Sequence, residues 1–321
     1  MTDKRISIVI PCYNEKENIL NMYNRLINMF QNVTENYEII FVNNGSFDGS
    51  DEIFDELTQR DKKVVVIELS RNFGSSGPAY TCGLEYATGD AVVMIDGDIQ
   101  DPPEIIPQMV DKWLEGYEVV YGIRKKRKDR NLIRKIGYKI FYIVFRRISY
   151  VKMPLDAGDF GLMDRKIVNI INSMPETNRF IRGMRAWAGY NSTGIEYCRQ
   201  DRQAGKTKYS FMEYIRASKV GLFSFSYAPL EYISHIAWIS TVIAALFLLY
   251  NLIGSIINPN APRGFATLIV TVLFMGSVQL LSLSIIGEYL GKVFDEVKRR
   301  PEYVVKRVVN YSRENQYLNQ L

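Results

Sequence analysis

The chain has 321 residues, 47% of them hydrophobic, which is enough for one large domain with a sizeable core and a further segment. Its net charge of +5 is mildly basic, and lysines and arginines cluster around 124–152 and 292–313, which indicates a local anionic partner. Because no zinc-finger spacing or RNA-recognition motif is present, no nucleic acid partner is expected, and a membrane surface explains the clusters better.

The amino terminus leads into an apolar run that is too short for a signal peptide, so no cleavage is expected. The three cysteines, Cys12, Cys82 and Cys198, are widely spaced and odd in number. This usage is typical of a reducing compartment, and it predicts neither a disulfide framework nor a cysteine metal site.

Short apolar runs alternate with helical stretches over 6–122, which predicts an α/β fold. Because the runs are continuous rather than alternating, they indicate strands buried on both faces of a mostly parallel sheet. The runs lie at 6–10, 37–43, 63–69, 90–95 and 117–123. Ligands of such sheets bind beyond the carboxyl ends of the strands. The segments to search for a site are therefore PCYNE, NNGSFDGS, SRNFGSSG and DGDIQDPP.

The fourth run ends in acidic residues. If extended geometry continues, Asp96, Asp98 and Gln100 project toward one side, since side chains of a strand repeat every two residues. Such an oxygen-only site prefers Mg²⁺ or Mn²⁺ and leaves positions open for phosphate oxygens. A D-x-D pair alone is weak evidence for a metal site, because it arises easily by chance and often forms a solvated turn. Its place after a buried strand strengthens the prediction of a metal site for a phosphorylated ligand.

Other nucleotide and catalytic motifs are missing. The first strand is not followed by G-x-G-x-x-G, and the chain has no P-loop and no G-x-S-x-G elbow. Its single histidine, His235, lies at the start of an apolar segment, which argues against acid–base chemistry by histidine. We therefore expect a nucleotide diphosphate donor that is held in another way.

Two long apolar segments, 236–257 and 265–287, contain no charged residue. At about 1.5 Å per residue each can cross a hydrocarbon core of roughly 30 Å, so we predict a transmembrane hairpin with spans at about 231–257 and 265–290. The turn between them has one arginine, whereas six lysines and arginines follow over 292–307. The positive-inside rule then predicts a multi-pass protein of the cytoplasmic (inner) membrane with both termini in the cytoplasm. Two buried helices of a soluble domain are the alternative.

Two further segments, 131–151 and 209–228, have the pattern of interfacial helices. For 131–151, a surface helix of the soluble domain is the alternative. We therefore expect a cytoplasmic catalytic domain over 1–228, a membrane part over 229–291 and a basic cytoplasmic tail over 292–321. Small residues in the second span would also allow close helix contacts or oligomerisation.

The motifs SIVIPCYNE, NNGSFDGS, LSRNFG, DGDIQDPPEIIPQM, AGDFGLMDR and DRQAGKTKY, followed by two spans and IIGEYLGKVFDEVKRRPEY, occur in this order over nearly the whole chain. In these motifs the sequence resembles the polyisoprenyl-phosphate glycosyltransferases of glycosyltransferase family 2. The resemblance implies a GT-A fold that transfers a sugar with inversion. The implied donor is a nucleotide sugar, with UDP expected as its nucleotide. The implied acceptor is a polyprenyl phosphate, with undecaprenyl phosphate expected. Relatives with two spans can be tetrameric.

The resemblance also assigns roles to matched positions. A nucleotide site is implied for Pro11, Tyr13, Glu15, Asn44, Asp48 and Asp96. A metal site is implied for Asp96, Asp98 and Gln100. Arg202 and Lys208 would bind the diphosphate, and Arg124 and Arg134 the acceptor phosphate. Asp159 would be a general base or a carboxylate that positions the acceptor, and it forms the catalytic set with Asp98 and Arg202. The alternatives are a helix N-cap for Asp159 and a solvated basic face for Arg124 and Arg134.

Elementary chemistry supports these roles. A nucleotide diphosphate leaves poorly until its charge is neutralised, so a divalent cation and Arg202 would lower the barrier as the sugar C1 becomes oxocarbenium-like. A phosphate monoester is largely dianionic at neutral pH and can attack without losing a proton. On this hypothesis Asp159 orients the acceptor rather than deprotonating it.

The chain departs from the family pattern at Asn44, where an acidic residue is common, at Ser75 and Ser76, where Lys-Glu is common, and at Gly161, where arginine is common. These changes predict an altered donor choice. Two other functions are alternatives. A processive polysaccharide synthase would need a Q-x-x-R-W motif and more spans, and a non-catalytic membrane adaptor would not need the acidic pair.

Overall fold

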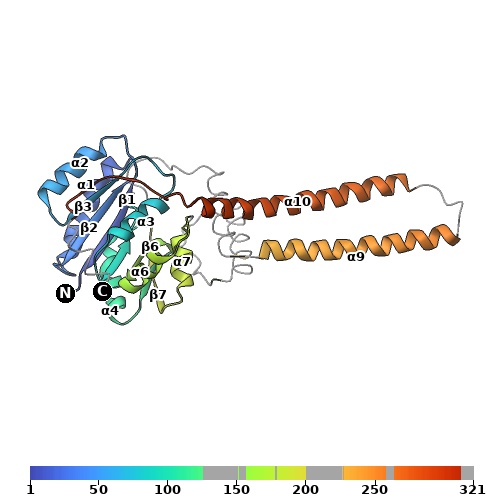
Figure 1. Cartoon of the computed structure of the whole chain (residues 1–321). Coiled ribbons are helices and arrows are strands. Elements are labelled where there is room, and N and C mark those ends of the chain that lie inside the picture. Colours follow the sequence, from blue (N-terminus) through green and yellow to red (C-terminus); the bar gives the residue numbers. More distant parts are fainter. Residues whose placement is uncertain are drawn as a thin grey trace.

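A computed structural model describes residues 1–125, 151, 157–177, 179–199, 226, 228–257 and 264–311 (Figure 1). The expected α/β fold with a mostly parallel sheet is confirmed. The strands are β1 (Ile6–Cys12), β2 (Tyr37–Asn43), β3 (Val64–Leu69), β4 (Ala91–Met94), β5 (Val119–Arg124), β6 (Ala157–Asp164), β7 (Ser192–Tyr197) and β8 (Val305–Val309). The helices are α1 (Lys16–Phe30), α2 (Ser50–Arg60), α3 (Gly77–Tyr86), α4 (Ile106–Leu114), α6 (Arg165–Ser173), α7 (Ile181–Trp187), α9 (Ala228–Ile257) and α10 (Phe265–Lys298), with a short 3₁₀ turn at Pro103–Ile105.

The sheet order is β7-β5-β6-β4-β1-β2-β3-β8. Strands β1 to β4 are parallel, and so are β5 and β7, whereas β6 is antiparallel to both of its neighbours. The carboxyl ends of six strands therefore meet at one edge of the sheet, which we call the carboxyl edge. Because β6 runs the other way, its first residues lie at this edge.

The continuous apolar runs are explained by burial on both faces. Ile6, Ile8 and Ile10 pack in one core cluster with α1, α2 and α4, while Val9 packs in a second cluster with α3, α6 and α7. Every residue of β1 is buried. A strand covered by helices on both faces gains burial at each position, which is why its sequence does not alternate.

The carboxyl-terminal segment differs from the expected basic tail. Helix α10 continues to Lys298, and β8 then pairs antiparallel with β3 as an edge strand. Arg307 of β8 bonds to Glu68 and Asp55, and the Thr177 backbone N–H donates to Glu296 of α10 at 3.0 Å. The basic residues predicted a basic cytoplasmic tail over 292–321, because their charge obscured the short Val-rich strand at Val305–Val309.

Helices α9 and α10 run side by side away from the sheet domain (Figure 1). Two stretches, Ala228–Phe247 and Thr271–Lys298, are long and apolar enough to cross a membrane. Only 6% of the most apolar part of the first is buried, and none of that of the second. Long apolar helices that none of the described residues cover are unlike the buried helices of a soluble core, so they support membrane association. The interfacial segments expected at 131–151 and 209–228 lie almost wholly outside the described residues.

Candidate active site

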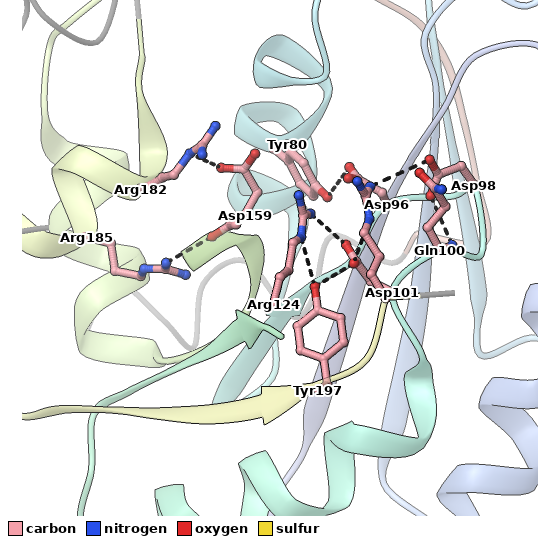
Figure 2. Close-up of polar contacts among 12 residues, drawn as sticks. Tyr80, Asp96, Asp98, Gln100, Asp101, Arg124, Asp159, Arg182, Arg185 and Tyr197 are labelled. Carbon is pink, nitrogen blue, oxygen red and sulfur yellow. Dashed lines mark hydrogen bonds and ion pairs between the residues drawn. The ribbon is translucent and has the colours of Figure 1, made fainter. Parts of the chain in front are cut away.

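The candidate site begins where β4 ends at Met94. The chain leaves extended geometry there, because Gly97 and Asp98 form a turn and Ile99 has a φ of 59° in the left-handed region. Ile99 is fully buried, so packing holds this β-branched residue in a conformation that it rarely adopts. The expected strand geometry is therefore wrong here. A turn, and not the pleat of a strand, places Asp96, Asp98 and Gln100 close to one another (Figure 2).

Asp96 lies at the centre of this acidic group and is only partly exposed. Among the described residues its hydrogen-bond partner is the Tyr80 hydroxyl of α3, which donates at 2.8 Å. Burial and the nearby carboxylates of Asp101, Asp159 and Asp98 raise the pKa of Asp96 to about 7. Arg124 also interacts electrostatically with Asp96, but burial and the neighbouring carboxylates outweigh it, so the pKa of Asp96 is still raised.

The donor set fits a divalent metal ion. Within the described ranges no group of three or more His, Cys, Asp or Glu side chains is placed to hold a metal. Asp96 and Asp98 nevertheless provide carboxylates for Mg²⁺ or Mn²⁺, ions that keep open positions for water and phosphate oxygens. The raised pKa of Asp96 agrees with this fit, because a cation beside these groups would offset their repulsion.

Asp101 has a different role from its two neighbours in the turn. It is fully buried and accepts a hydrogen bond from the Tyr197 hydroxyl at 2.6 Å. Arg124 pairs with it at 3.2 Å, and Arg199 approaches it at 3.3 Å and Asp98 at 4.0 Å. Arg124 is therefore held inside the site wall rather than on a solvated face (Figure 2). Sequence reasoning missed Tyr197 and Arg199. Their one signal in the sequence is their position just before the DRQAGK motif.

Asp159 enters the site from β6, which begins at the carboxyl edge. Its carboxylate pairs with Arg182 of α7 at 3.2 Å and is 28% exposed (Figure 2). The alternative of Asp159 as a helix N-cap is wrong, because it lies within β6. Asp164 caps α6 instead, where its side chain accepts from the Lys166 backbone N–H at 3.0 Å.

The loops after β1 and β2 are the predicted nucleotide site. In the sheet order these two strands lie on one side of β4, and β6, which carries Asp159, lies on the other. Asn14 and Ser46 join these loops, since the Asn14 backbone N–H donates to Ser46 Oγ at 2.9 Å and Asn14 Oδ1 accepts from the Phe47 N–H at 3.0 Å. Tyr13 and Phe47 meet edge to face with centroids 6.1 Å apart, and Phe47 is 81% exposed. This rigid, partly aromatic edge suits a flat nucleotide base.

Three of the expected nucleotide residues also have structural partners. Glu15 is buried and accepts from Asn18 at 2.6 Å. Asp48 accepts from the Lys16 backbone N–H at 3.0 Å; burial acts to raise its pKa, but hydrogen bonds from Ser50 and Lys16 lower it. Asn44 Oδ1 accepts from the Phe73 N–H at 3.0 Å. These side chains shape the loops of the predicted nucleotide site.

Pro11 is buried at the end of β1. Its carbonyl oxygen would lie 2.9 Å from a Cβ atom at Gly97, so the loop after β1 and the acidic turn approach too closely for any other residue at 97. Arg134, Arg202 and Lys208 lie outside the described residues. The structure thus brings together Asp96, Asp98, Gln100, Arg124 and Asp159, and adds Tyr80, Asp101, Arg182, Tyr197 and Arg199.

Comparison with known proteins agrees with this architecture. Residues 7–171, just over half of the chain, match the model of the family described as glycosyl transferase family 2. An uncharacterised glycosyltransferase of Synechocystis is 41% identical over 94% of this chain and 94% of its own length. An uncharacterised glycosyltransferase of Bacillus subtilis is 41% identical over 97% and 96%. A prophage bactoprenol glucosyl transferase homologue of Escherichia coli is 36% identical over 95% and 99%.

Proposed function

This chain belongs to glycosyltransferase family 2, and from that premise we propose that it transfers a sugar from a nucleotide-diphosphate donor to a polyprenyl phosphate. The relatives named as bactoprenol glucosyl transferases support the acceptor class, since they match 94–95% of the chain. That coverage extends beyond the sheet domain. We infer UDP as the nucleotide, undecaprenyl phosphate as the lipid, and inversion at the anomeric carbon.

One observation carries the proposal. The carboxylates of Asp96 and Asp98 follow a buried parallel strand, and Asp159 from an antiparallel strand lies close enough to raise the pKa of Asp96. A diphosphate held at Asp96 and Asp98 would therefore place its sugar toward Asp159. This arrangement needs both strand directions, and a non-catalytic adaptor would have no use for it.

In the mechanism, Asp96 and Asp98 would hold Mg²⁺ or Mn²⁺, with Gln100 beside them. The bound ion supplies positive charge that stabilises the departing diphosphate. Arg199, Arg202 and Lys208 would add further positive charge at the leaving group. Asp159 would orient the acceptor phosphate, which is largely dianionic at neutral pH and attacks C1 without losing a proton.

The membrane arrangement follows from the same reaction. A polyprenyl phosphate keeps its chain in the bilayer, so the site must face the membrane surface. Helix α10 leads directly into β8, which is part of the sheet, and this connection would hold the sheet domain close to the membrane. We propose that α9 and α10 cross the cytoplasmic membrane with the sheet domain in the cytoplasm, and that copies of the chain can assemble through α10.

The test is direct transfer by the purified full chain in detergent. Undecaprenyl phosphate, Mg²⁺ or Mn²⁺ and a panel of nucleotide sugars are incubated with the protein, and extracted lipids are weighed by mass spectrometry. We expect a lipid heavier by one sugar with one donor, and loss of that product with EDTA. Absence of every sugar-phosphate lipid across the panel, with folded protein, would contradict the proposal.

A further inference from the structure

The described arginines around the acidic group divide into two sets. Arg124 and Arg199 lie beside Asp101, and Arg124 also donates from Nε to the Tyr197 hydroxyl at 3.1 Å. On the other side of the site, Arg182 and Arg185 project from α7 toward the start of β6 (Figure 2). The carboxylate of the first set is fully buried, whereas Asp159 and Arg182 of the second set are partly exposed, so the second set is the better place for a new anion.

Arg185 is a buried charge with few partners. Its residue is 6% exposed, and its hydrogen bond among the described residues is from Nη2 to the Gly158 carbonyl oxygen at 3.3 Å. Burial lowers the pKa of Arg185 to about 10, and Asp159 is the nearby carboxylate that opposes this. A guanidinium has five donors, and a buried cation without its own counterion is costly.

Arg182 differs because it is open to solvent. Its side chain is 40% exposed. Asp159 is the carboxylate that pairs with it among the described residues. Among the described residues, the two guanidinium groups and the one carboxylate of Asp159 leave one positive charge in excess at this side of the site. A phosphate monoester with nearly two negative charges would complete the balance, and an arginine fork binds phosphate in a bidentate manner.

The backbone makes room for this arrangement. A Cβ atom at Gly161 would lie 2.9 Å from Arg185 Nη1 and 2.7 Å from the Val120 carbonyl oxygen. The Arg185 side chain therefore fills the space beside β6 that a side chain at 161 would take. This contact fixes the guanidinium behind Asp159, on the side away from Asp96.

We propose that the face of α7 bearing Arg182 and Arg185 receives the phosphate of the acceptor. Arg182 contacts the phosphate, Asp159 lies next to it, and Arg185 is a positioning residue that contributes buried positive charge from behind. The inference rests on the proposed function, because it takes the acceptor to be a lipid phosphate. It adds Arg182 and Arg185 to Arg124 and Arg134, the two residues that the family resemblance implies for the acceptor phosphate.

Steady-state transfer by the full chain in detergent tests the assignment, with acceptor and donor varied separately. A charge-assisted hydrogen bond contributes about 1.5–3 kcal/mol, so Arg182→Gln is expected to raise the KM of a polyprenyl phosphate by roughly 10- to 100-fold. The KM of the donor stays within about twofold, and Arg182→Lys recovers part of the loss. Lys166→Gln is the matched control, because it removes the cation of the Lys166–Glu118 pair at the opposite edge of the sheet. It should change neither KM.

Arg185 needs a gentler change, since its removal could unfold the domain. Arg185→Lys keeps the charge and is expected to raise the acceptor KM less than Arg182→Gln, again without an effect on the donor. A rise in donor KM for either variant would overturn the inference. So would a fall in kcat with both KM values unchanged, because that result would mean that Arg182 only orients Asp159.

Direct binding separates this inference from the proposed function. Decyl phosphate, inorganic phosphate and decanol are titrated into the full chain without donor, and binding is followed by isothermal calorimetry. We expect decyl phosphate to bind wild type and to bind Arg182→Gln at least tenfold more weakly, with inorganic phosphate weakened in parallel and decanol unaffected. If these binding results are obtained but wild type transfers no sugar, the proposed function alone is contradicted. Transfer by wild type with decyl phosphate binding unchanged in Arg182→Gln would sink the inference alone, and absence of both transfer and binding in wild type would sink both.

Discussion

Glu38 and Asp96 are acidic residues at opposite edges of one sheet, and their surroundings differ. Glu38, in β2, is 3% exposed and accepts hydrogen bonds from Ser7 Oγ at 2.5 Å, the Thr88 N–H at 2.7 Å and Arg5 at 3.0 Å. Asp96 has the Tyr80 hydroxyl as its donor and carboxylates around it. Three of the described residues donate to Glu38, whereas one of them donates to Asp96.

The comparison teaches how to separate a structural acid from a functional one. Burial alone does not separate them, because Asp101 lies at the carboxyl edge, is fully buried and is still paired with Arg124 and Tyr197. The difference lies in the balance of charge and donors around each carboxylate. By that criterion Asp96 is the candidate functional acid of the turn, and Asp101 supports the wall.

The largest expected effect comes from removing one functional acid. Asp98→Ala should lower kcat for sugar transfer by on the order of 10³-fold or more, because charge stabilisation of the leaving group is lost. Circular dichroism and the melting temperature should stay near those of wild type. Turnover within tenfold of wild type would remove Asp98 from the metal site and would break the distinction between the two edges.

Metal removal and pH should act on Asp96 next. Its folded pKa of about 7 lies above the unfolded value of 3.8, so its contribution to stability is complete below about pH 4 and is lost as pH rises toward 7. At about 1.4 kcal/mol per pKa unit, the metal-free protein should lose at most about 4 kcal/mol from this group.

Thermal denaturation at pH 5 and pH 8, with EDTA or with Mn²⁺, measures this loss. Mn²⁺ should restore stability at pH 8, and Asp96→Asn should remove both the pH effect and the metal effect. Glu302 also has a pKa raised to about 7 by burial, so Glu302→Gln serves as a control for the rest of the pH slope. Equal metal stabilisation of wild type and Asp96→Asn would contradict the assignment.

A matching change at the amino edge, the sheet edge opposite the carboxyl edge, should lower stability and leave the kinetics unchanged. Glu38→Gln keeps the shape but removes the charge that holds Arg5, so the free energy of unfolding should fall by about 2–4 kcal/mol. The KM values of the folded fraction should not change. Urea denaturation and kinetics below the unfolding transition measure the two quantities, and an altered donor KM would show that the amino edge also serves the site.

Two glycines give the smallest and most specific test. A Cβ atom at Gly161 meets Val120 and Arg185, and one at Gly89 meets the Ser7 backbone nitrogen at 2.7 Å. Either alanine should cost about 1–3 kcal/mol through overpacking. Gly161→Ala should also raise the acceptor KM, because it displaces Arg185, whereas Gly89→Ala should affect stability alone. Equal acceptor KM values for the two variants would remove Gly161 from the site.

Much of the sheet could be predicted from sequence. The runs at 6–10, 37–43 and 63–69 are recognisable because a strand buried on both faces needs an apolar side chain at nearly every position. The acidic turn was found for a related reason, since charged residues directly after a buried strand mark the edge where the chain emerges. Both signals are local and can be read in a window of a few residues.

The partners of these residues could not be predicted in this way. Asp159 reaches Asp96 only because β6 is antiparallel to β4 and β5, and no local pattern in AGDFGLMD reports its direction. Arg182 and Arg185 were missed because two arginines three apart on a short helix resemble any solvated face. The strand β8 was missed because its pairing with β3 joins residues about 240 positions apart in the chain.

The sequence by itself determined the α/β class, the place of the acidic turn and the two apolar helices, because burial on all sides requires an unbroken run of apolar residues in each of these elements. The tertiary structure alone decided which carboxylates meet several donors, as Glu38 and Asp101 do, and which is crowded by other carboxylates, as Asp96 is. That outcome depends on the charges and hydrogen-bond donors that distant segments bring to each carboxylate. A short stretch of sequence does not show which distant residues will lie beside it.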